Sequence, residues 1–240
     1  MHFIDTHIHL QDFNEDFALE VLRNEGLKKA VVVASKENDY EKIAYFMDNY
    51  KDKVIGAFGV HPWYKDLDFS VEKLVNYLKK YPNSLVGEIG LDGIKGNVND
   101  EQCRLFEKEL EVAKTFSRPV VVHGAKAFGF LVNYKKELKS VKFVYHGFTK
   151  NKELIKFIND CGGYFGLGSM FLRQKDANEM IKDMPFNKVL FESDAPYQLK
   201  EKSYFIDVKN NIESLSELLR MNCKDVEMLF IQNAKEFIKC

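Results

Sequence analysis

Histidine and carboxylate side chains recur where short apolar segments of this sequence end. Five of the six histidines share this position, namely His7, His9, His61, His123 and His146. Glu88 and Asp194 stand near the ends of two further segments. Imidazole nitrogens and carboxylate oxygens together suit one or two borderline divalent cations. The residue types therefore predict a metal centre, provided that the segments end at one place in the fold.

The first of these segments carries the pair His7-x-His9. Side chains two residues apart on a strand point to the same face, so both rings can reach one ion. Alone the pair is a weak signal, because a single histidine on a strand is more often a core residue. The whole set is not explained in that way, since scattered core histidines have no reason to prefer the same end of successive segments.

Eight short runs rich in β-branched and apolar residues predict strands. The runs are His2–His9, Lys29–Ser35, Val54–His61, Ser84–Leu91, Arg118–His123, Val141–His146, Cys161–Gly168 and Lys188–Ser193. Some of them, such as Ala30–Ala34 and Pro119–Val122, are apolar without interruption. Continuous apolar runs are typical of strands that are buried on both faces, as in parallel sheets.

Helical patterns separate these runs. Apolar residues repeat at helical spacing over residues 71–78, 103–113, 212–219 and 226–237. Alternation of strand and helix favours a parallel sheet with right-handed crossovers, and eight strands close a barrel whose active site lies at the C-terminal ends of the strands. An open doubly wound sheet is the alternative, but no Gly-x-Gly-x-x-Gly follows the first strand. We predict an α/β fold in which residues 1–240 form a single (β/α)8 TIM barrel with a metal site at that mouth.

Composition excludes several other classes of protein. The chain has 35 Lys and Arg against 36 Asp and Glu, so its formal charge is −1, which argues against a generally basic nucleic-acid coat protein and an acidic disordered tail. No signal peptide or long apolar span is evident, and the four scattered cysteines are expected to be reduced thiols. We therefore expect a cytoplasmic protein that needs neither a membrane nor an obligate protein partner.

Short motifs spread over nearly the whole chain resemble those of the TatD-type metal-dependent hydrolases, within the amidohydrolase-like superfamily. The motifs are Phe3-Ile4-Asp5-Thr6-His7-Ile8-His9-Leu10, Gly59-Val60-His61-Pro62, Val86-Gly87-Glu88-Ile89-Gly90-Leu91-Asp92, Pro119-Val120-Val121-Val122-His123, Tyr145-His146-Gly147-Phe148, Glu192-Ser193-Asp194-Ala195-Pro196-Tyr197 and Asn233-Ala234-Lys235-Glu236-Phe237. Their order and spacing are similar to those of the family. The resemblance implies a barrel with a binuclear metal site.

The resemblance also implies how the ligands divide between two divalent ions, whether Zn, Mn, Ni, Fe or Mg. His7, His9 and Asp194 would hold one ion, whereas His123 and His146 would hold the other, with Glu88 bridging the two. Known activities in the family are mainly DNase or phosphodiester hydrolysis, so DNA or a small phosphodiester is the expected substrate. Asp194 and Glu88 are the expected catalytic residues, and Asp194 would accept the proton of the attacking water. Asp5, two residues before His7, is expected one layer deeper on the same face.

Two departures from the family concern the substrate side. The family usually has His-Ser-Arg after the fifth strand, where this chain has His123-Gly124-Ala125-Lys126. The family's Arg- and Asn-Pro-containing loop after Tyr197 is also absent. The candidates for substrate binding are His61 against a phosphate or a metal-bound water, Trp63 against a nucleobase, and Lys126, Lys150 or Arg173 in place of the missing arginine.

Three functions follow in order of preference. The first is a metal-dependent deoxyribonuclease or phosphodiesterase that uses a metal-activated water. The second is an amide, ester or lactone hydrolase on the same barrel. Binuclear enzymes of that kind commonly bridge their metals with a carboxylated lysine, whereas the fourth strand here offers Glu88. The third is a catalytically silent binding protein, which would have no physical need for the six ligands.

Overall fold

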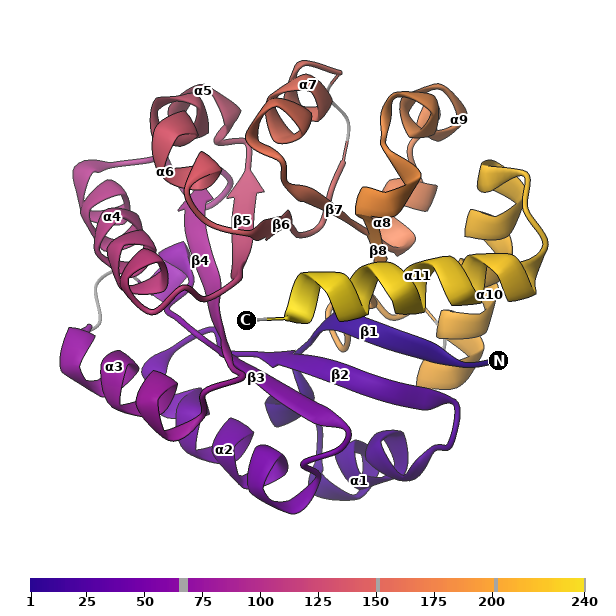
Figure 1. The fold of residues 1–240 in the computed structure, drawn as a ribbon, viewed down its shortest axis with the longest axis horizontal. Coiled ribbons are helices and arrows are strands. Elements are labelled where there is room, and N and C mark those ends of the chain that lie inside the picture. The colour runs from indigo at the N-terminus through magenta and orange to yellow at the C-terminus, as the bar shows by residue number, and fades with distance from the viewer. Residues whose placement is uncertain (65–68, 150–151, 201–202, 240) are drawn as a thin grey trace.

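Eight parallel strands pair in chain order to form one sheet. The structure is a computed structural model that describes residues 1–64, 69–149, 152–200 and 203–239. The strands are β1 (Phe3–Ile8), β2 (Leu27–Val33), β3 (Val54–Phe58), β4 (Leu85–Asp92), β5 (Val120–Ala125), β6 (Phe143–Tyr145), β7 (Tyr164–Leu167) and β8 (Val189–Phe191). A parallel bridge between Ile8 and Ala195, with a hydrogen bond from Asp194 N to His7 O, joins the end of β8 to β1. The sheet is therefore a barrel (Figure 1).

The helices lie outside the sheet: α1 to α9 connect successive strands, whereas α10 and α11 follow β8, and α11 lies across one end of the barrel (Figure 1). They are α1 (Glu15–Arg23), α2 (Tyr40–Asn49), α3 (Val71–Lys80), α4 (Asp100–Thr115), α5 (Phe128–Leu131), α6 (Lys135–Lys139), α7 (Lys152–Cys161), α8 (Ser169–Leu172), α9 (Ala177–Met180), α10 (Tyr204–Leu219) and α11 (Cys223–Ile238). Several begin at a side chain that accepts a hydrogen bond from the first turn, as Asn14 does for α1 and Ser70 does for α3. Such caps satisfy backbone N–H groups that have no partner within the helix.

Two apolar cores hold the barrel together. The larger core fills the layer between the strands and the helices. The smaller core lies inside the barrel, and it contains Ile4, Val31, Val121 and Leu190 from four different strands. Phe237 of α11 belongs to this second core, so α11 packs against the barrel interior at the end where the strands begin. The opposite end, where the strands finish, is left for the site.

The TIM barrel predicted from the sequence is confirmed, and the open doubly wound sheet is excluded. Each of the eight apolar runs contains most or all of one strand. The four segments with helical spacing lie within α3, α4, α10 and α11. Cys103, Cys161 and Cys223 are free thiols, as expected; Cys240 lies outside the described residues.

Backbone contact between β4 and β5 requires a glycine close to the site. Gly90 pairs with His123 and has a φ of +148°, a conformation that side-chain-bearing residues rarely adopt. A Cβ atom at residue 90 would lie 2.0 Å from His123 O. This glycine therefore lets the strand that carries Glu88 lie directly against the strand that carries His123.

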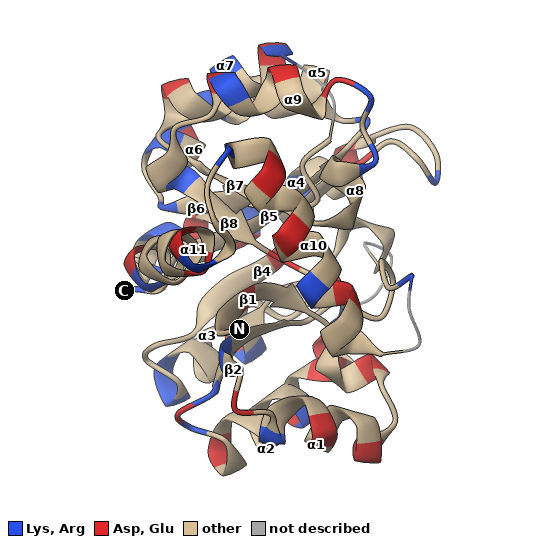
Figure 2. Ribbon diagram, turned by 90° about the vertical axis from the view of Figure 1, so that its right-hand side faces the viewer, with Lys and Arg blue, Asp and Glu red and all other residues tan. Residues whose placement is uncertain are grey.

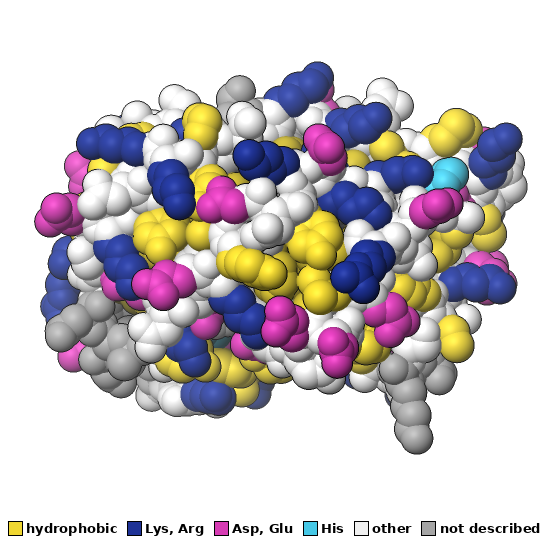
Figure 3. All heavy atoms as spheres, turned by 90° about the horizontal axis from the view of Figure 1, so that it is seen from below, with side chains coloured by type: hydrophobic (Ala, Val, Ile, Leu, Met, Phe, Trp, Pro, Cys, Tyr) yellow, Lys and Arg dark blue, Asp and Glu magenta, His cyan; other side chains and the backbone are white. Residues whose placement is uncertain are grey.

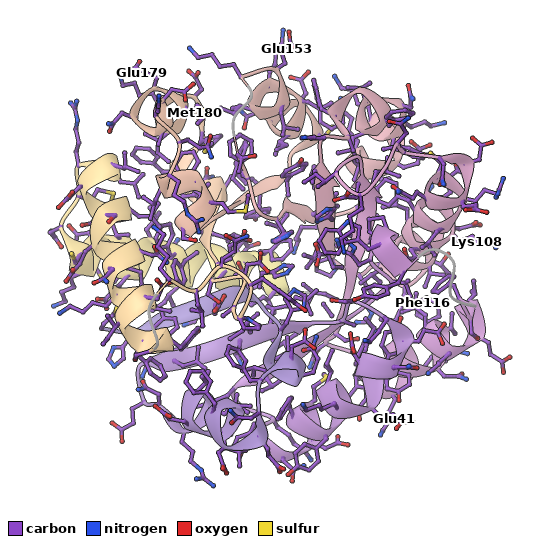
Figure 4. The ribbon with its side chains drawn as sticks, turned by 180° about the vertical axis from the view of Figure 1, so that it is seen from behind. Glu41, Lys108, Phe116, Glu153, Glu179 and Met180 are labelled. Carbon is purple, nitrogen blue, oxygen red and sulfur yellow. The ribbon has the colours of Figure 1, made fainter. Side chains whose placement is uncertain are left out.

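Charged side chains lie mainly on the outer helices and loops, whereas the strands carry few of them (Figure 2). The face seen from below, on the side of α1 to α3, mixes both signs of charge with hydrophobic groups (Figure 3). Figure 4, seen from behind, places the labelled Glu41, Lys108 and Glu153 on the outer ring of helices. Within the described ranges, no helix is long and apolar enough to cross a membrane.

Candidate metal centre

Glu88 is the middle of the site, because its two carboxylate oxygens face two separate groups of side chains. Its Oε2 atom lies 3.5 Å from His7 Nε2 and 3.8 Å from His9 Nε2. Asp194 Oδ1 stands beside the same two rings, at 3.7 Å from His7 Nε2 and 3.5 Å from His9 Nε2. The two Nε2 atoms are 3.1 Å apart, as the His-x-His spacing on one strand face predicts. We call His7, His9 and Asp194 the Oε2 half of the site.

The other oxygen, Glu88 Oε1, faces imidazoles from three further strands or their ends. It lies 2.8 Å from His123 Nδ1, 3.2 Å from His146 Nε2 and 3.7 Å from His61 Nε2. We call His61, His123 and His146 the Oε1 half. Apart from His123, which is partly exposed, these rings are buried.

The chemistry of the donors fits divalent metal ions. Three sets of side chains place one ligand atom each within 4.8 Å of one another: His7, His9 and Glu88; His7, His146 and Asp194; and His61, Glu88 and His123. Nitrogen lone pairs and carboxylate oxygens converge here in a buried place, where unpaired like charges are costly. Cations between them would relieve that cost, and this mixture of imidazole and carboxylate suits zinc and related transition metals.

Comparison with known proteins identifies the family of this chain. Residues 4–239 match the family described as TatD related DNase. The chain belongs to the TatD-related DNase family. An uncharacterized metal-dependent hydrolase of Haemophilus influenzae is 30% identical over 216 residues, which cover 82% of each chain. The human deoxyribonuclease TATDN3 is 24% identical over 96% of this chain and 92% of its own.

A solved structure supports the fold. The TatD homologue YjjV of Escherichia coli K12 superposes with a TM-score of 0.84 at 24% identity, covering 98% of this chain and 97% of that one. The resemblance inferred from the motifs is thus confirmed at the level of the family. The identity to this structure is low enough that the likeness shows the barrel and not the reaction.

Burial and neighbouring charges oppose each other throughout this TatD-family site. Burial alone would raise the pKa of Glu88, but the surrounding histidines, His146 foremost, hold it well below its usual range. Burial would likewise raise the pKa of Asp194, yet the hydrogen bond from His9 and the nearby histidines lower it. Both carboxylates are therefore ionised at neutral pH and available as ligands.

The pKa values of the histidines are shifted in different directions, because burial and nearby carboxylates contribute differently at each ring. Burial and the proximity of His146 lower the pKa of His7. Burial would lower the pKa of His146 as well, but Glu88 and Glu192 raise it well above its usual value. His61 has no such carboxylate in hydrogen-bond contact, and burial lowers its pKa to about 3, so its ring is neutral.

Three residues that the sequence analysis did not single out touch the outer edges of the histidine rings. Asp92 Oδ2 lies 2.8 Å from His123 Nε2, and Glu192 Oε1 lies 3.3 Å from His146 Nδ1. The Gln11 amide is 3.3 Å from His9 Nδ1. Such partners orient metal-binding rings and fix their protonation. Asp92 and Glu192 stand in the same motifs as Glu88 and Asp194, so strand-end position was the signal that could have found them.

Asp194 is directed to the site and not to the turn that follows it. Its side chain is largely buried, and its backbone has a φ of +51°, a conformation that aspartate tolerates better than most residues. The turn is capped instead by Ser193, whose Oγ accepts a hydrogen bond from Ala195 N. The Asp194 carboxylate consequently remains beside His7 and His9.

Asp5 lies deeper in the barrel, as expected, but it binds backbone and not a ligand side chain. Its Oδ1 accepts hydrogen bonds from His7 N at 3.2 Å and Ser193 N at 3.0 Å, and its Oδ2 accepts one from Tyr204 Oη at 2.7 Å. Asp5 therefore fixes the backbone on both sides of the Oε2 half.

A cleft of about 690 Å³ opens from the candidate metal centre. Trp63 and Lys126 line it, and both are exposed, as a role in substrate binding requires. Lys95 Nζ lies 3.5 Å from the centre of the Trp63 ring. Arg173 donates to Ser169 Oγ and to Gln198 Oε1. The last of the predicted cations, Lys150, lies outside the described residues.

Proposed function

We propose that this protein hydrolyses phosphodiester bonds, with DNA as the expected substrate, by means of two divalent metal ions. The observation that supports this most strongly is the two-sided environment of Glu88, with His7 and His9 against one oxygen and His123 and His146 against the other. A carboxylate placed in this way can bridge two adjacent ions and reduce the repulsion between them. Paired ions are a common device of phosphoryl-transfer enzymes.

The proposal assigns each half of the site to one ion. His7, His9 and Asp194 would hold the first, and His123 and His146 the second. When bound, such ions lower the pKa of a coordinated water towards neutrality and offset the charge of the phosphate. The nitrogen-rich donor set favours Zn, Mn, Ni or Fe over Mg.

The chain's own residues would supply proton transfer and substrate binding. Asp194 is ionised and faces the cleft, so its carboxylate can accept the proton of the attacking water. Lys126 would pair with a phosphate oxygen, and Trp63 would stack on a nucleobase. The ammonium of Lys126 is a weaker and less directional partner than the family's arginine, because it cannot make two parallel hydrogen bonds to a phosphate.

One observation favours hydrolysis of a small amide, ester or lactone as the second candidate. Among the described residues that line the cleft, Lys126 is the sole lysine or arginine, whereas Glu88, Asp92 and Asp194 are acidic. Apolar side chains such as Ile94 and Phe128 make up much of the remaining wall. A long polyanion gains little from such a lining, so a compact substrate fits it better.

The test is a substrate panel on protein reconstituted separately with each metal. We expect hydrolysis of single-stranded DNA and bis-p-nitrophenyl phosphate, and none of neutral esters, amides or lactones. Asp194→Asn keeps the shape and one ligand oxygen, so it should retain the fold and most of the metal while kcat falls by roughly 10²-fold or more. Preference for a neutral ester would favour the second candidate, and inactivity on every substrate with every metal would leave a binding protein.

A further inference from the structure

We propose that His61 is a neutral hydrogen-bond donor to the substrate, with its proton held on Nε2, and that it is not a metal ligand. This inference rests on the proposed function for the identity of the substrate, but the assignment of the proton rests on the structure alone. His61 belongs to one of the three sets whose spacing would suit an ion, so distance by itself does not separate the two roles.

The backbone N–H of Trp63 determines which nitrogen of the His61 ring carries the proton. Trp63 N donates a hydrogen bond to His61 Nδ1 at 3.0 Å. A backbone N–H can only donate, so Nδ1 must present its lone pair. A proton on Nδ1 would point at the N–H proton of Trp63, which excludes both the Nδ1-protonated neutral ring and the doubly protonated ring. The remaining form carries its only proton on Nε2.

The main chain around His61 is held from three sides, which keeps this hydrogen bond in place. His61 N donates to Ser35 O at 2.9 Å, and Tyr64 N donates to His61 O at 2.8 Å. Just before it, Val60 N donates to the buried carboxyl group of Glu109 at 2.6 Å. The short turn that delivers the Trp63 N–H is therefore part of a rigid support, as a fixed donor requires.

The other two rings of the Oε1 half have the opposite arrangement. His123 Nε2 faces Asp92 Oδ2 at 2.8 Å, and His146 Nδ1 faces Glu192 Oε1 at 3.3 Å. A carboxylate behind one nitrogen attracts a proton to that nitrogen and leaves the other nitrogen free to bind a metal. His61 has a donor behind it, so its inner nitrogen carries the proton and has no lone pair for an ion.

The position of the Nε2–H group indicates which partner it can donate to. Nε2 lies 3.7 Å from Glu88 Oε1, which is longer than a hydrogen bond, and the residue lines the cleft. The proton therefore points towards the place where the two halves of the site meet the substrate. A fixed, neutral donor at that place stabilises negative charge that develops on a phosphate oxygen in the transition state.

Variants that keep or remove the donor test this role. In His61→Gln the side-chain amide nitrogen lies near the former Nε2 position, whereas His61→Asn places its amide near the former Nδ1 position. We expect His61→Ala and His61→Asn to lower kcat on bis-p-nitrophenyl phosphate by about 10²-fold, the usual cost of one preorganised donor. His61→Gln should recover part of that loss, and KM should change little in all three.

Metal content and tautomer separate a donor from a ligand without any substrate. Elemental analysis should find the same number of ions in wild type and in all three His61 variants, whereas His146→Ala, the matched ligand control, should lose one. Long-range ¹H–¹⁵N NMR spectra of the metal-free wild type, with the His61 signals assigned by their absence in His61→Gln, should show the proton on Nε2.

Three results would overturn the inference: an ion lost in His61→Gln, a proton found on Nδ1, or unchanged kcat in His61→Ala. None of them is produced by failure of the proposed function, which instead appears as inactivity of the wild type towards every phosphodiester. In that case the NMR and metal results still decide whether His61 is a ligand.

Discussion

The two halves of the site are built on different plans. In the Oε2 half, a carboxylate stands among the ligands themselves, because Asp194 lies beside both His7 and His9. In the Oε1 half, carboxylates stand behind the imidazoles, where Asp92 and Glu192 contact the outer nitrogens. In the first arrangement a carboxylate would contact a bound ion directly, whereas in the second the carboxylates would affect the ion only through the imidazole rings.

If two ions bind as proposed, this difference predicts that their affinities are unequal. An ion in the Oε2 half would have two carboxylates, Glu88 and Asp194, together with two imidazoles. An ion in the Oε1 half would have Glu88 and two imidazoles, and would lie on the side where His61 offers a proton. We expect the Oε2 ion to bind more tightly and the Oε1 ion to exchange more readily, since ligand charge contributes strongly to affinity for divalent cations.

Removing the charge of Glu88 should break both halves at once and give the largest effect. Glu88→Gln keeps the shape of the side chain but cannot bridge two cations. We expect loss of most bound metal and a fall in kcat of at least 10³-fold, equivalent to about 4 kcal/mol. Elemental analysis and kcat on the same preparation measure this, with Glu41→Gln on the outer face of α2 as the control. Two ions retained in Glu88→Gln would show that the halves are independent.

Asp92→Asn should affect one half alone. The Oδ1 atom of Asp92 accepts hydrogen bonds from Ile94 N and Lys95 N, and asparagine can keep both with its carbonyl oxygen. The charge facing His123 is lost, and partners of this kind contribute about 10–100-fold to metal affinity or activity. Metal titration should therefore show the weaker site weakened further and the tighter one unchanged. Equal weakening of both sites would contradict the division into halves.

The sequence could predict the barrel and the convergence of the candidate ligands at one mouth, because both follow from strand order. Strands buried on both faces, such as Val54–Phe58, are continuous apolar runs, and parallel strands in a barrel end at one mouth. A ligand at a strand end, such as His123 or His146, is thereby placed near the others before any contact is known. Strand ends were predicted less well: β3 ends at Phe58 and not at His61.

Contacts that depend on side-chain conformation or on loop geometry could not be predicted from the order of the strands. The hydrogen bond from Trp63 N to His61 Nδ1 depends on a tight turn after Pro62, and no pattern of residue types reveals which ring nitrogen a backbone N–H will meet. Arg173 could be named as a candidate cation, but its bonds to Ser169 and Gln198 arise from the packing of α8 against the loop after β8. Such details need the three-dimensional arrangement.

Lys126→Ala tests the substrate side with a smaller expected effect. An exposed ammonium contributes up to about 1 kcal/mol to an ion pair, so KM for a phosphodiester should rise about fivefold and kcat should change little. A neutral ester, if one is turned over at all, should be unaffected. The control is Lys108→Ala, which removes an ammonium from the outer ring of helices. Equal effects on charged and neutral substrates would show that Lys126 does not contact the phosphate and is only a surface residue.

The smallest effect concerns the support behind the Oε1 half. Glu109 on α4 is fully buried and holds Val60 N, and burial raises its pKa well above its usual value. A carboxyl group whose pKa is raised on folding makes the folded state less stable as pH increases from the unfolded pKa, about 4.3, through the folded value. Below that window the group is protonated in both states and has no such cost.

Glu109→Gln should therefore stabilise the protein, and only as the pH rises. The glutamine oxygen can still accept the hydrogen bond from Val60 N. Glutamine does not ionise, so the variant avoids the cost of keeping a buried carboxyl group either charged or protonated at high pH. We expect the free energy of unfolding of Glu109→Gln to match wild type near pH 4 and to exceed it by on the order of 1 kcal/mol at pH 8. Urea denaturation across this range, without metal and with the exposed Glu111→Gln as control, measures the difference. A constant difference at every pH would mean that Glu109 does not titrate with folding, and that the backbone before His61 is held by a carboxylate that is already charged.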